Sequence, residues 1–145
     1  MTPQLRSRAH LEKHGWTVAT VEALKRFPDK HVPACRACGA QKMVMIRSDL
    51  LGFADIFAFN ATNVMLVQST DSSNMSKRWA KIREIDAARA WIADPGRLLA
   101  VHGWRKKKGF WQLKEKLITE ADFLVAPGTL AAVFADWEDE EELPF

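Results

Sequence analysis

The sequence predicts a single α/β domain whose mixed sheet lies between helices. Its 145 residues are close to the commonest size of one domain. Apolar residues recur at helical spacing over residues 75–94, and short runs rich in apolar and β-branched residues lie before and after this segment. Strands, then a helix, then further strands are typical of an α/β sandwich, because a crossover returns the chain to the same sheet.

The first predicted elements are a helix and a strand. Thr2 and Pro3 form a typical helix start, and Gly15 is a typical stop. The alternating, β-branched residues 16–22 then predict a strand. Prolines, a glycine and many charges predict a long loop over residues 25–42, of which 27–42 are counted as an insertion. Residues 43–46 are a candidate extension of a strand.

The later elements follow from apolar runs and their breaks. Residues 53–59 and 64–68 predict two strands joined by a turn at 60–63. The helix over 75–94 ends at Pro95 and Gly96. Strands are expected over 97–104 and 110–118, joined by a basic turn at 105–109, and a final helix is expected within 128–137. The domain therefore covers residues 1–135, and 136–145 form an acidic tail.

Charge is distributed unevenly along the chain. The net charge is +3, but residues 136–145 hold six acids and no base, and the remainder holds 21 basic and 12 acidic side chains, a net charge of +9. A basic body favours a polyanion as partner, and an acidic tail can compete with that partner. Basic proteins that bind no nucleic acid are also common, so charge alone leaves both classes open.

The composition favours a cytoplasmic protein with no membrane partner. No apolar run is long enough to cross a bilayer, and the start of the chain lacks the apolar stretch of a signal peptide. Two cysteines, Cys35 and Cys38, give no disulfide framework, which fits a reducing compartment.

The predicted hairpin "DIFAFNATNVMLVQST", residues 55–70, carries polar side chains at both ends. Gln68 and Thr70 share one face of their strand, and pairing across the turn brings Asp55 close to Gln68. A carboxylate, an amide oxygen and a backbone carbonyl are ligands that suit Mg²⁺. Such an ion can activate water and stabilise charge on a phosphate. The structural alternative is a satisfied Asp–Gln pair beside an ordinary strand threonine.

The stretches "RSDLLGFADIFAFN", "VMLVQSTDSSNMSKRWAKI" and "VHGWRKK" resemble small phage-type members of the PD-(D/E)XK nuclease superfamily, which includes Holliday-junction resolvases. The resemblance implies a restriction-endonuclease-like αβββαβ core and hydrolysis of DNA with Mg²⁺ or Mn²⁺. It also implies branched DNA as substrate and the cytoplasm of a bacterium or phage-infected host as location. Symmetrical cutting of two strands further implies a homodimer.

The same resemblance assigns roles to several acids. Asp55 matches the principal metal-binding acid, and Gln68 stands at the second ligand position, where the family usually has another acid. Glu22 matches the family's early glutamate, and Glu12 is the second choice. Asp49 is either an outer metal ligand or a turn residue that caps "DLLG".

Thr70 occupies the position of the family's lysine, and this is the main departure from the pattern. A hydroxyl cannot supply the positive charge that orients water. In some members the lysine is thought to migrate to the following helix, where Lys77, Arg78 and Lys81 are the candidates. Helical spacing puts Lys77 and Lys81 on one face.

The predicted hairpin tip carries four consecutive cations: Arg105, Lys106, Lys107 and Lys108. These cations fit contacts with a phosphate backbone, and the alternative is a solvated turn that protects a sheet edge. His102 is interpreted as a packed strand histidine and not as a catalytic base. Five tryptophans are expected mostly in the core: Trp16, Trp79, Trp91, Trp104 and Trp111.

His31, Cys35 and Cys38 form a local cluster of potential zinc ligands. Structural zinc requires four ligands, so His10, His14 or a partner subunit would have to complete the set. The alternative is a pair of free thiols.

The C-terminal "EDEEELPF" resembles the acidic tip of bacterial single-stranded-DNA-binding proteins, with matching positions at residues 140–142, Pro144 and Phe145. The resemblance implies recruitment of repair or replication enzymes through Phe145, or a tail that folds back on the basic body. The alternative is a solubilising tail. Two other functions stay open: a DNA-binding accessory module that does not cleave, and an interaction protein without nucleic acid.

Overall fold

The computed structural model describes residues 1–124, so the helix predicted within 128–137 and the acidic tail lie outside the described residues. The helices are α1 (Pro3–Lys13), α2 (Met75–Arg83) and α3 (Asp86–Ile92), with short 3-10 helices η1 (Ser72–Asn74) and η2 (Glu120–Phe123). The strands are β1 (Thr17–Thr20), β2 (Ala23–Pro28), β3 (Met43–Ser48), β4 (Ile56–Phe59), β5 (Val64–Asp71), β6 (Arg97–Lys107) and β7 (Phe110–Leu117). None of the helices in this part of the chain could span a membrane.

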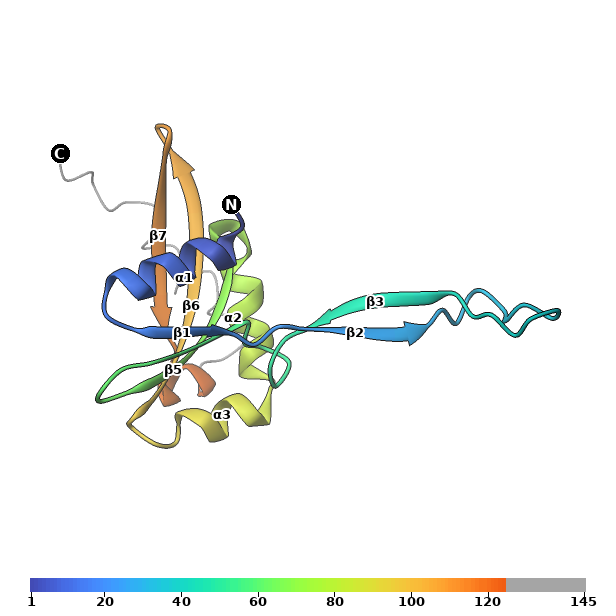
Figure 1. The fold of residues 1–145 in the computed structure, drawn as a ribbon. Coiled ribbons are helices and arrows are strands. Elements are labelled where there is room, and N and C mark those ends of the chain that lie inside the picture. Colours follow the sequence, from blue (N-terminus) through green and yellow to red (C-terminus); the bar gives the residue numbers. More distant parts are fainter. Residues whose placement is uncertain (125–145) are drawn as a thin grey trace.

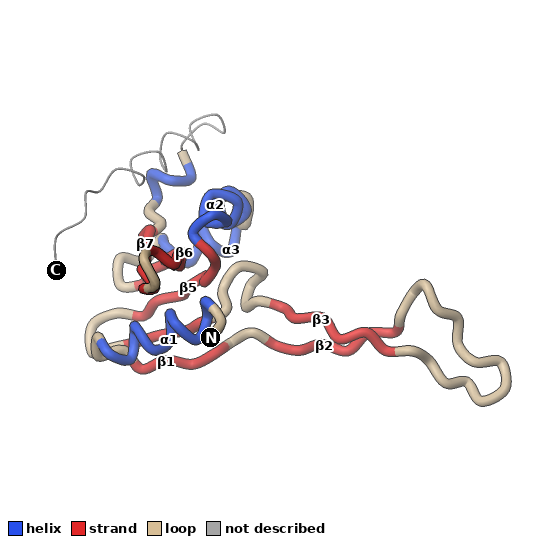
Figure 2. The backbone as a smooth tube through the Cα atoms, turned by 90° about the horizontal axis from the view of Figure 1, so that it is seen from above, coloured by secondary structure: helices blue, strands red, loops and turns tan. Residues whose placement is uncertain are grey.

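The main sheet has five strands in the order β1-β4-β5-β6-β7. All neighbours are antiparallel except β5 and β6, which are parallel because α2 and α3 form the crossover between them. Figures 1 and 2 show α1 on one face of the sheet and α2 with α3 on the other. The predicted α/β class with a mixed sheet between helices is confirmed.

Strand alternation divides the core between the two faces of the sheet. One cluster packs Leu66 of β5 and Leu99 of β6 beneath Trp79 and Ile82 of α2. The other cluster, under α1, contains Leu11, Ile56, Ala58, Met65, Val67 and Ala100. This arrangement determines the face of the sheet on which each side chain of β4, β5 and β6 lies, because successive strand residues point to opposite sides.

Polar contacts attach α1 to the sheet. The Ser7 and Ser69 hydroxyl oxygens lie 2.7 Å apart, and the Trp104 indole N–H donates to Ser7 Oγ at 2.8 Å. Ser7 is fully buried, so these hydrogen bonds satisfy a polar group that would otherwise destabilise the interface.

Several predicted boundaries were wrong. β1 ends at Thr20 and β4 begins at Ile56, whereas β5 continues to Asp71. The helix predicted over 75–94 is two helices, because Ile85 has an extended backbone (φ −98°, ψ 113°) and packs against the core between them. Neither glycine nor proline marks this break, so the sequence pattern gave no signal for it.

The loop predicted over 25–42 is partly strand. β2 and β3 pair antiparallel with each other as a separate two-stranded sheet. Residues 23–48 form the β2–β3 arm, which projects away from the body in Figures 1 and 2. Pro28 ends β2 opposite Met43, a position where proline removes no interior hydrogen bond of a sheet.

The β6–β7 hairpin differs from its prediction at the tip. β6 extends through Lys107, and the turn consists of Lys108 and Gly109, whose positive φ values of 50° and 86° are those of a two-residue hairpin turn. The predicted burial of Trp111 is wrong: the residue is 43% exposed, and the Arg6 guanidinium carbon lies 3.5 Å from the ring centroid.

The other tryptophans agree better with the prediction. Trp79 and Trp104 are buried, and Trp16 and Trp91 are half-buried against the two clusters.

Candidate metal site

Asp55 and Gln68 lie side by side at one end of the β4–β5 pair. Ile56 pairs with Val67, so Asp55, one residue earlier, lies opposite Gln68 and on the same face. Both side chains are buried, with 7% and 3% exposed, and so is Thr70 at 6%. The predicted proximity of Asp55 and Gln68 is confirmed.

The Asp55 carboxyl is held by the backbone of β5. Its Oδ1 accepts a hydrogen bond from the Ser69 N–H at 3.0 Å. Burial raises the pKa of Asp55 to about 7; the Ser69 N–H opposes this shift, and the charges of Asp49 and Glu22 add to it. A buried carboxyl of this kind is stabilised in its ionised form by a nearby cation, including a divalent metal ion.

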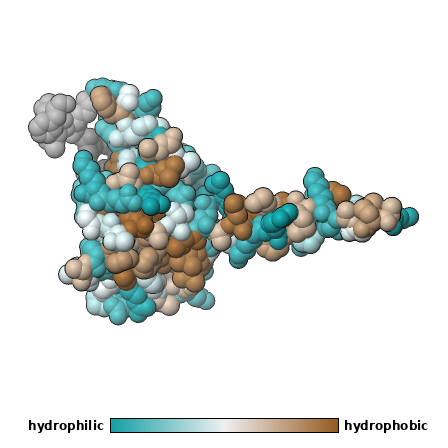
Figure 3. All heavy atoms as spheres, in the orientation of Figure 1, coloured by the Kyte–Doolittle hydropathy of each residue, from teal (hydrophilic) through white to brown (hydrophobic). Residues whose placement is uncertain are grey.

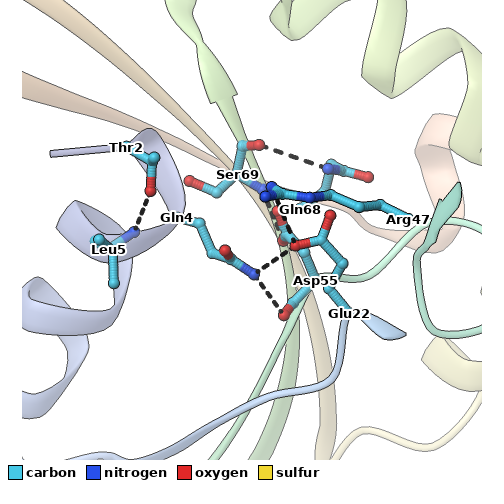
Figure 4. A network of polar contacts seen from close by, with 8 residues as sticks. All are labelled: Thr2, Gln4, Leu5, Glu22, Arg47, Asp55, Gln68 and Ser69. Atoms are coloured by element: carbon cyan, nitrogen blue, oxygen red, sulfur yellow. Dashed lines mark hydrogen bonds and ion pairs between the residues drawn. The ribbon is translucent and has the colours of Figure 1, made fainter. Parts of the chain in front are cut away.

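Glu22, just after β1, reaches the same place. The Gln4 side chain of α1 donates to Glu22 Oε2 at 3.4 Å and to the Asp55 backbone carbonyl at 3.3 Å (Figure 4). The Val21 N–H donates to the same carbonyl at 3.1 Å. Glu12 instead pairs with Arg8 at 2.9 Å on the surface. The structure therefore brings Glu22, and not Glu12, beside Asp55.

Asp49 lies in the turn that leads into Asp55. Its carbonyl accepts from the Gly52 N–H at 3.2 Å, and Leu51 and Gly52 have positive φ values of 55° and 82°. The side chain is close enough to raise the pKa of Asp55. Both sequence interpretations, turn residue and outer ligand, are compatible with this position.

The ligand set available is small. Within residues 1–124, no three or more His, Cys, Asp or Glu side chains converge as a metal cluster. A divalent ion would therefore be held by Asp55, the Gln68 amide oxygen, a backbone carbonyl and water, with Glu22 nearby. The Gln68 amide nitrogen donates weakly to the Ser69 carbonyl at 3.5 Å, which leaves the amide oxygen for a ligand. Oxygen ligands with several waters are the usual environment of Mg²⁺.

A cation from β3 contacts this site through Glu22. Arg47 Nη1 lies 4.0 Å from Glu22 Oε2, and Figure 4 shows this ion pair in the same polar network as Asp55. Arg47 is not among the cations predicted from the sequence, because the family resemblance places a migrated lysine on the helix after β5. The available signal was the proximity of Arg47 to Asp49 and Asp55 in "RSDLLGFAD".

The three predicted cations of α2 lie wholly or partly at the surface. Lys77 and Lys81 are exposed and Arg78 is half-buried. Among the described residues, no hydrogen bond or ion pair joins them to Asp55 or Gln68. Their proposed role stays a prediction.

A second polar cluster lies on the opposite face, under α1. His102 is fully buried, its Nε2 is 2.6 Å from Glu115 Oε2, and the ring centroid of His10 is 6.0 Å away. The hydrogen bond from His102 lowers the pKa of Glu115. The interpretation of His102 as a packed strand histidine is confirmed.

The predicted DNA-binding cations line the β6–β7 tip. Arg105 Nε donates to Gln112 Oε1 at 3.2 Å, whereas Lys106 and Lys108 are exposed. The predicted contact of these cations with phosphates stays a prediction.

Cys35 and Cys38 are exposed free thiols at the far end of the β2–β3 arm. The Gly39 N–H donates to the Cys35 carbonyl at 2.8 Å, and the N–H groups of Cys38 and Ala37 lower the pKa of the Cys35 thiol. His10 lies on α1 and His14 directly follows it, and Figure 1 shows α1 well away from this end of the arm. The option that they complete a zinc site within one chain is therefore wrong, and zinc with His31 and a partner subunit stays a prediction.

No protein-family model, curated protein or solved structure matches the chain. Functional inference therefore depends on the resemblance of the motifs and on the geometry described above.

Proposed function

We propose that the protein is a divalent-metal-dependent DNA endonuclease with a restriction-endonuclease-like fold. The single observation that carries this proposal is a buried carboxyl with a raised pKa, Asp55, beside Gln68 and Glu22 at one end of a β hairpin. The order α1, β1, β4, β5, α2 with α3, and β6 also agrees with the αβββαβ order when the β2–β3 arm is treated as an insertion.

In the proposed mechanism the chain positions the ion and the phosphate. Asp55 and Gln68 hold a Mg²⁺ or Mn²⁺, and Gln4 orients Glu22 beside them. The bound ion would activate water and stabilise charge on the phosphate. Burial around Asp55 excludes competing water and strengthens these interactions.

Arg47 is proposed to supply the charge that Thr70 lacks. The family's lysine position is neutral here, and the Arg47 side chain is 70% exposed at the edge of the site, where a phosphate can reach it. The cations of the β6–β7 tip would hold the DNA backbone away from the reacting bond. Cutting of branched DNA and a homodimer are further parts of the proposal.

The testing experiment is a cleavage assay with labelled four-way junction, duplex and single-stranded DNA in Mg²⁺, Mn²⁺ or EDTA. We expect cutting only with the metal, and a loss of more than about a hundredfold in Asp55→Ala with DNA binding retained. Glu84→Ala, an exposed acid after α2, is the matched control and should cut normally. Metal-independent cutting, or full activity in Asp55→Ala, would contradict the proposal.

A second candidate function is a nuclease-fold module that binds DNA without cutting it. The neutral Thr70 favours this alternative. Salt-sensitive binding with no cutting under any ion would establish it. A protein with no DNA affinity would instead support an interaction role without nucleic acid.

A further inference from the structure

We propose that the β2–β3 arm is a DNA-binding ribbon that enters a groove of the duplex and delivers the backbone to the candidate metal site. The inference rests on the proposed function for its partner, DNA, but not on cleavage. It assigns a surface to residues 23–48, of which the sequence predicted 25–42 as a loop and 43–46 as a candidate strand extension.

Charge is the first argument. The 26 residues of the arm hold one acid, Asp29, and six basic side chains, which gives a net charge of +5. The basic side chains are Lys25, Arg26, Lys30, Arg36, Lys42 and Arg47. Within residues 1–124, two of these cations form ion pairs: Lys42 with Asp29 at 3.9 Å and Arg47 with Glu22 at 4.0 Å. A polyanion complements such a surface, and phosphate neutralisation is the main source of affinity for DNA.

Exposure is the second argument. Every residue of β2 and all but the last of β3 are exposed. The register alternates cations with apolar side chains: Lys25 lies opposite Ile46, and Arg26 lies opposite Met45. Figure 3 shows hydrophobic and hydrophilic spheres intermixed along the arm. A two-stranded ribbon alone in water is marginally stable, so a partner that covers both faces would stabilise it.

A groove of duplex DNA provides such a cover. The major groove is about 12 Å wide and admits a two-stranded β ribbon. Six strand residues extend about 20 Å, enough to lie along the groove. There the cations reach phosphates on both walls, and side chains such as Leu24 and Met45, 60% and 59% exposed, can contact base and sugar edges.

Position is the third argument. The arm leaves the body directly after Glu22 and returns directly before Asp49, so its base adjoins Asp55. Arg47 at this base already contacts Glu22. A duplex held along the arm would therefore pass the candidate metal site. A second copy of the chain is a poorer partner, because two arms of net charge +5 repel each other.

The experiment measures binding to a fluorescent duplex by anisotropy, in EDTA and over a range of salt concentrations. Lys25→Gln/Arg26→Gln removes two exposed arm charges that form no ion pair within the part of the chain that the structure describes. Lys13→Gln/Arg89→Gln, exposed positions on α1 and α3, is the matched control. A third variant replaces residues 25–46 with Asn-Gly, which closes the arm at the Leu24–Arg47 pair.

We expect the arm double variant to bind about tenfold more weakly at moderate salt and to reduce the salt slope by about two, since each lost phosphate contact removes about 0.9. The shortened arm should weaken binding further, and the control should bind like the parent. Because EDTA prevents metal-dependent cutting, this result would stand even if the protein proves to be no nuclease.

Two results would overturn the inference. One is parental affinity and salt slope in the arm double variant. The other is a fall from dimer to monomer in the shortened variant, measured by light scattering, with DNA binding unchanged in the double variant, since that would make the arm a self-association surface.

Discussion

Asp55 is a carboxyl in a position that favours its neutral form. Burial and the neighbouring charges of Asp49 and Glu22 raise its pKa to about 7 from an ordinary value of 3.8. Without a cation the ionised form therefore destabilises the fold. Groups with strongly shifted pKa values are common at functional sites, because catalysis and binding require pKa values that differ from those best for stability.

Asp55→Asn should stabilise the protein at high pH in EDTA. A raised folded-state pKa gives stability that is complete below about pH 4 and is lost as the pH rises through about 7. Asparagine keeps an oxygen for the Ser69 N–H but never ionises. The free energy of unfolding of the variant should therefore exceed that of the parent by up to about 4 kcal/mol at pH 8 and by little at pH 4. Chemical denaturation at both pH values measures this, and an equal difference at both would contradict it.

Arg47→Gln should slow cleavage more than it weakens DNA binding. The guanidinium lies beside Glu22, and in the proposed mechanism it provides the positive charge that Thr70 cannot. We expect a fall of about 10- to 100-fold in the cutting rate at saturating DNA. Arg47→Lys, which keeps the charge, should recover part of the rate. An unchanged rate in Arg47→Gln would show that another cation performs this role.

At this scale the sequence predicted what strand pairing determines and missed what depends on distant segments. Asp55 and Gln68 were found because a short hairpin fixes their pairing. Gln4 and Arg47 were not found, since they approach from α1 and β3, and no local pattern indicates where those elements lie.

Among the elements, η1 and α2 approach β6 closely at Gly103. A Cβ added to Gly103 would overlap the Met75 side chain and lie 3.1 Å from the Ser72 Cα. Glycine is therefore required by packing here, and it is next to Thr70 in the parallel register.

Gly103→Ala should destabilise the fold by about 1–3 kcal/mol, because the crowded backbone of η1 must shift. Thermal denaturation measures the effect. In a Met75→Ala background the same substitution should have a smaller effect, since part of the overlap is gone. Equal effects in both backgrounds would place the strain elsewhere.

The order of helices and strands was largely predictable, and their ends were not. Apolar runs indicated β4, β5, β6 and β7 because buried strands require them. The helix break at Ile85 and the strands of the arm depend on tertiary packing and on pairing between exposed residues. The hydrophobic periodicity and the secondary-structure propensities of the sequence indicate neither the helix break nor the strands of the arm.

On the scale of the whole molecule, a basic body and arm are linked to an acidic C-terminal segment. Deletion of residues 136–145 changes the net charge from +3 to +9. DNA affinity at low salt should therefore rise, several-fold or more, and the gain should shrink as salt screens it. Deletion of Phe145 alone keeps every acid and should leave DNA affinity unchanged. A gain that is independent of salt would exclude an electrostatic cause.

We propose a divalent-metal site formed by Asp55, Gln68 and Glu22, and titration of Mn²⁺ by isothermal calorimetry at pH 8 measures binding to it. We expect one ion per chain in the parent, no ion at this site in Asp55→Asn, and about 10- to 100-fold weaker binding in Glu22→Gln. Parental Mn²⁺ binding in Asp55→Asn, or no binding in the parent, would contradict it.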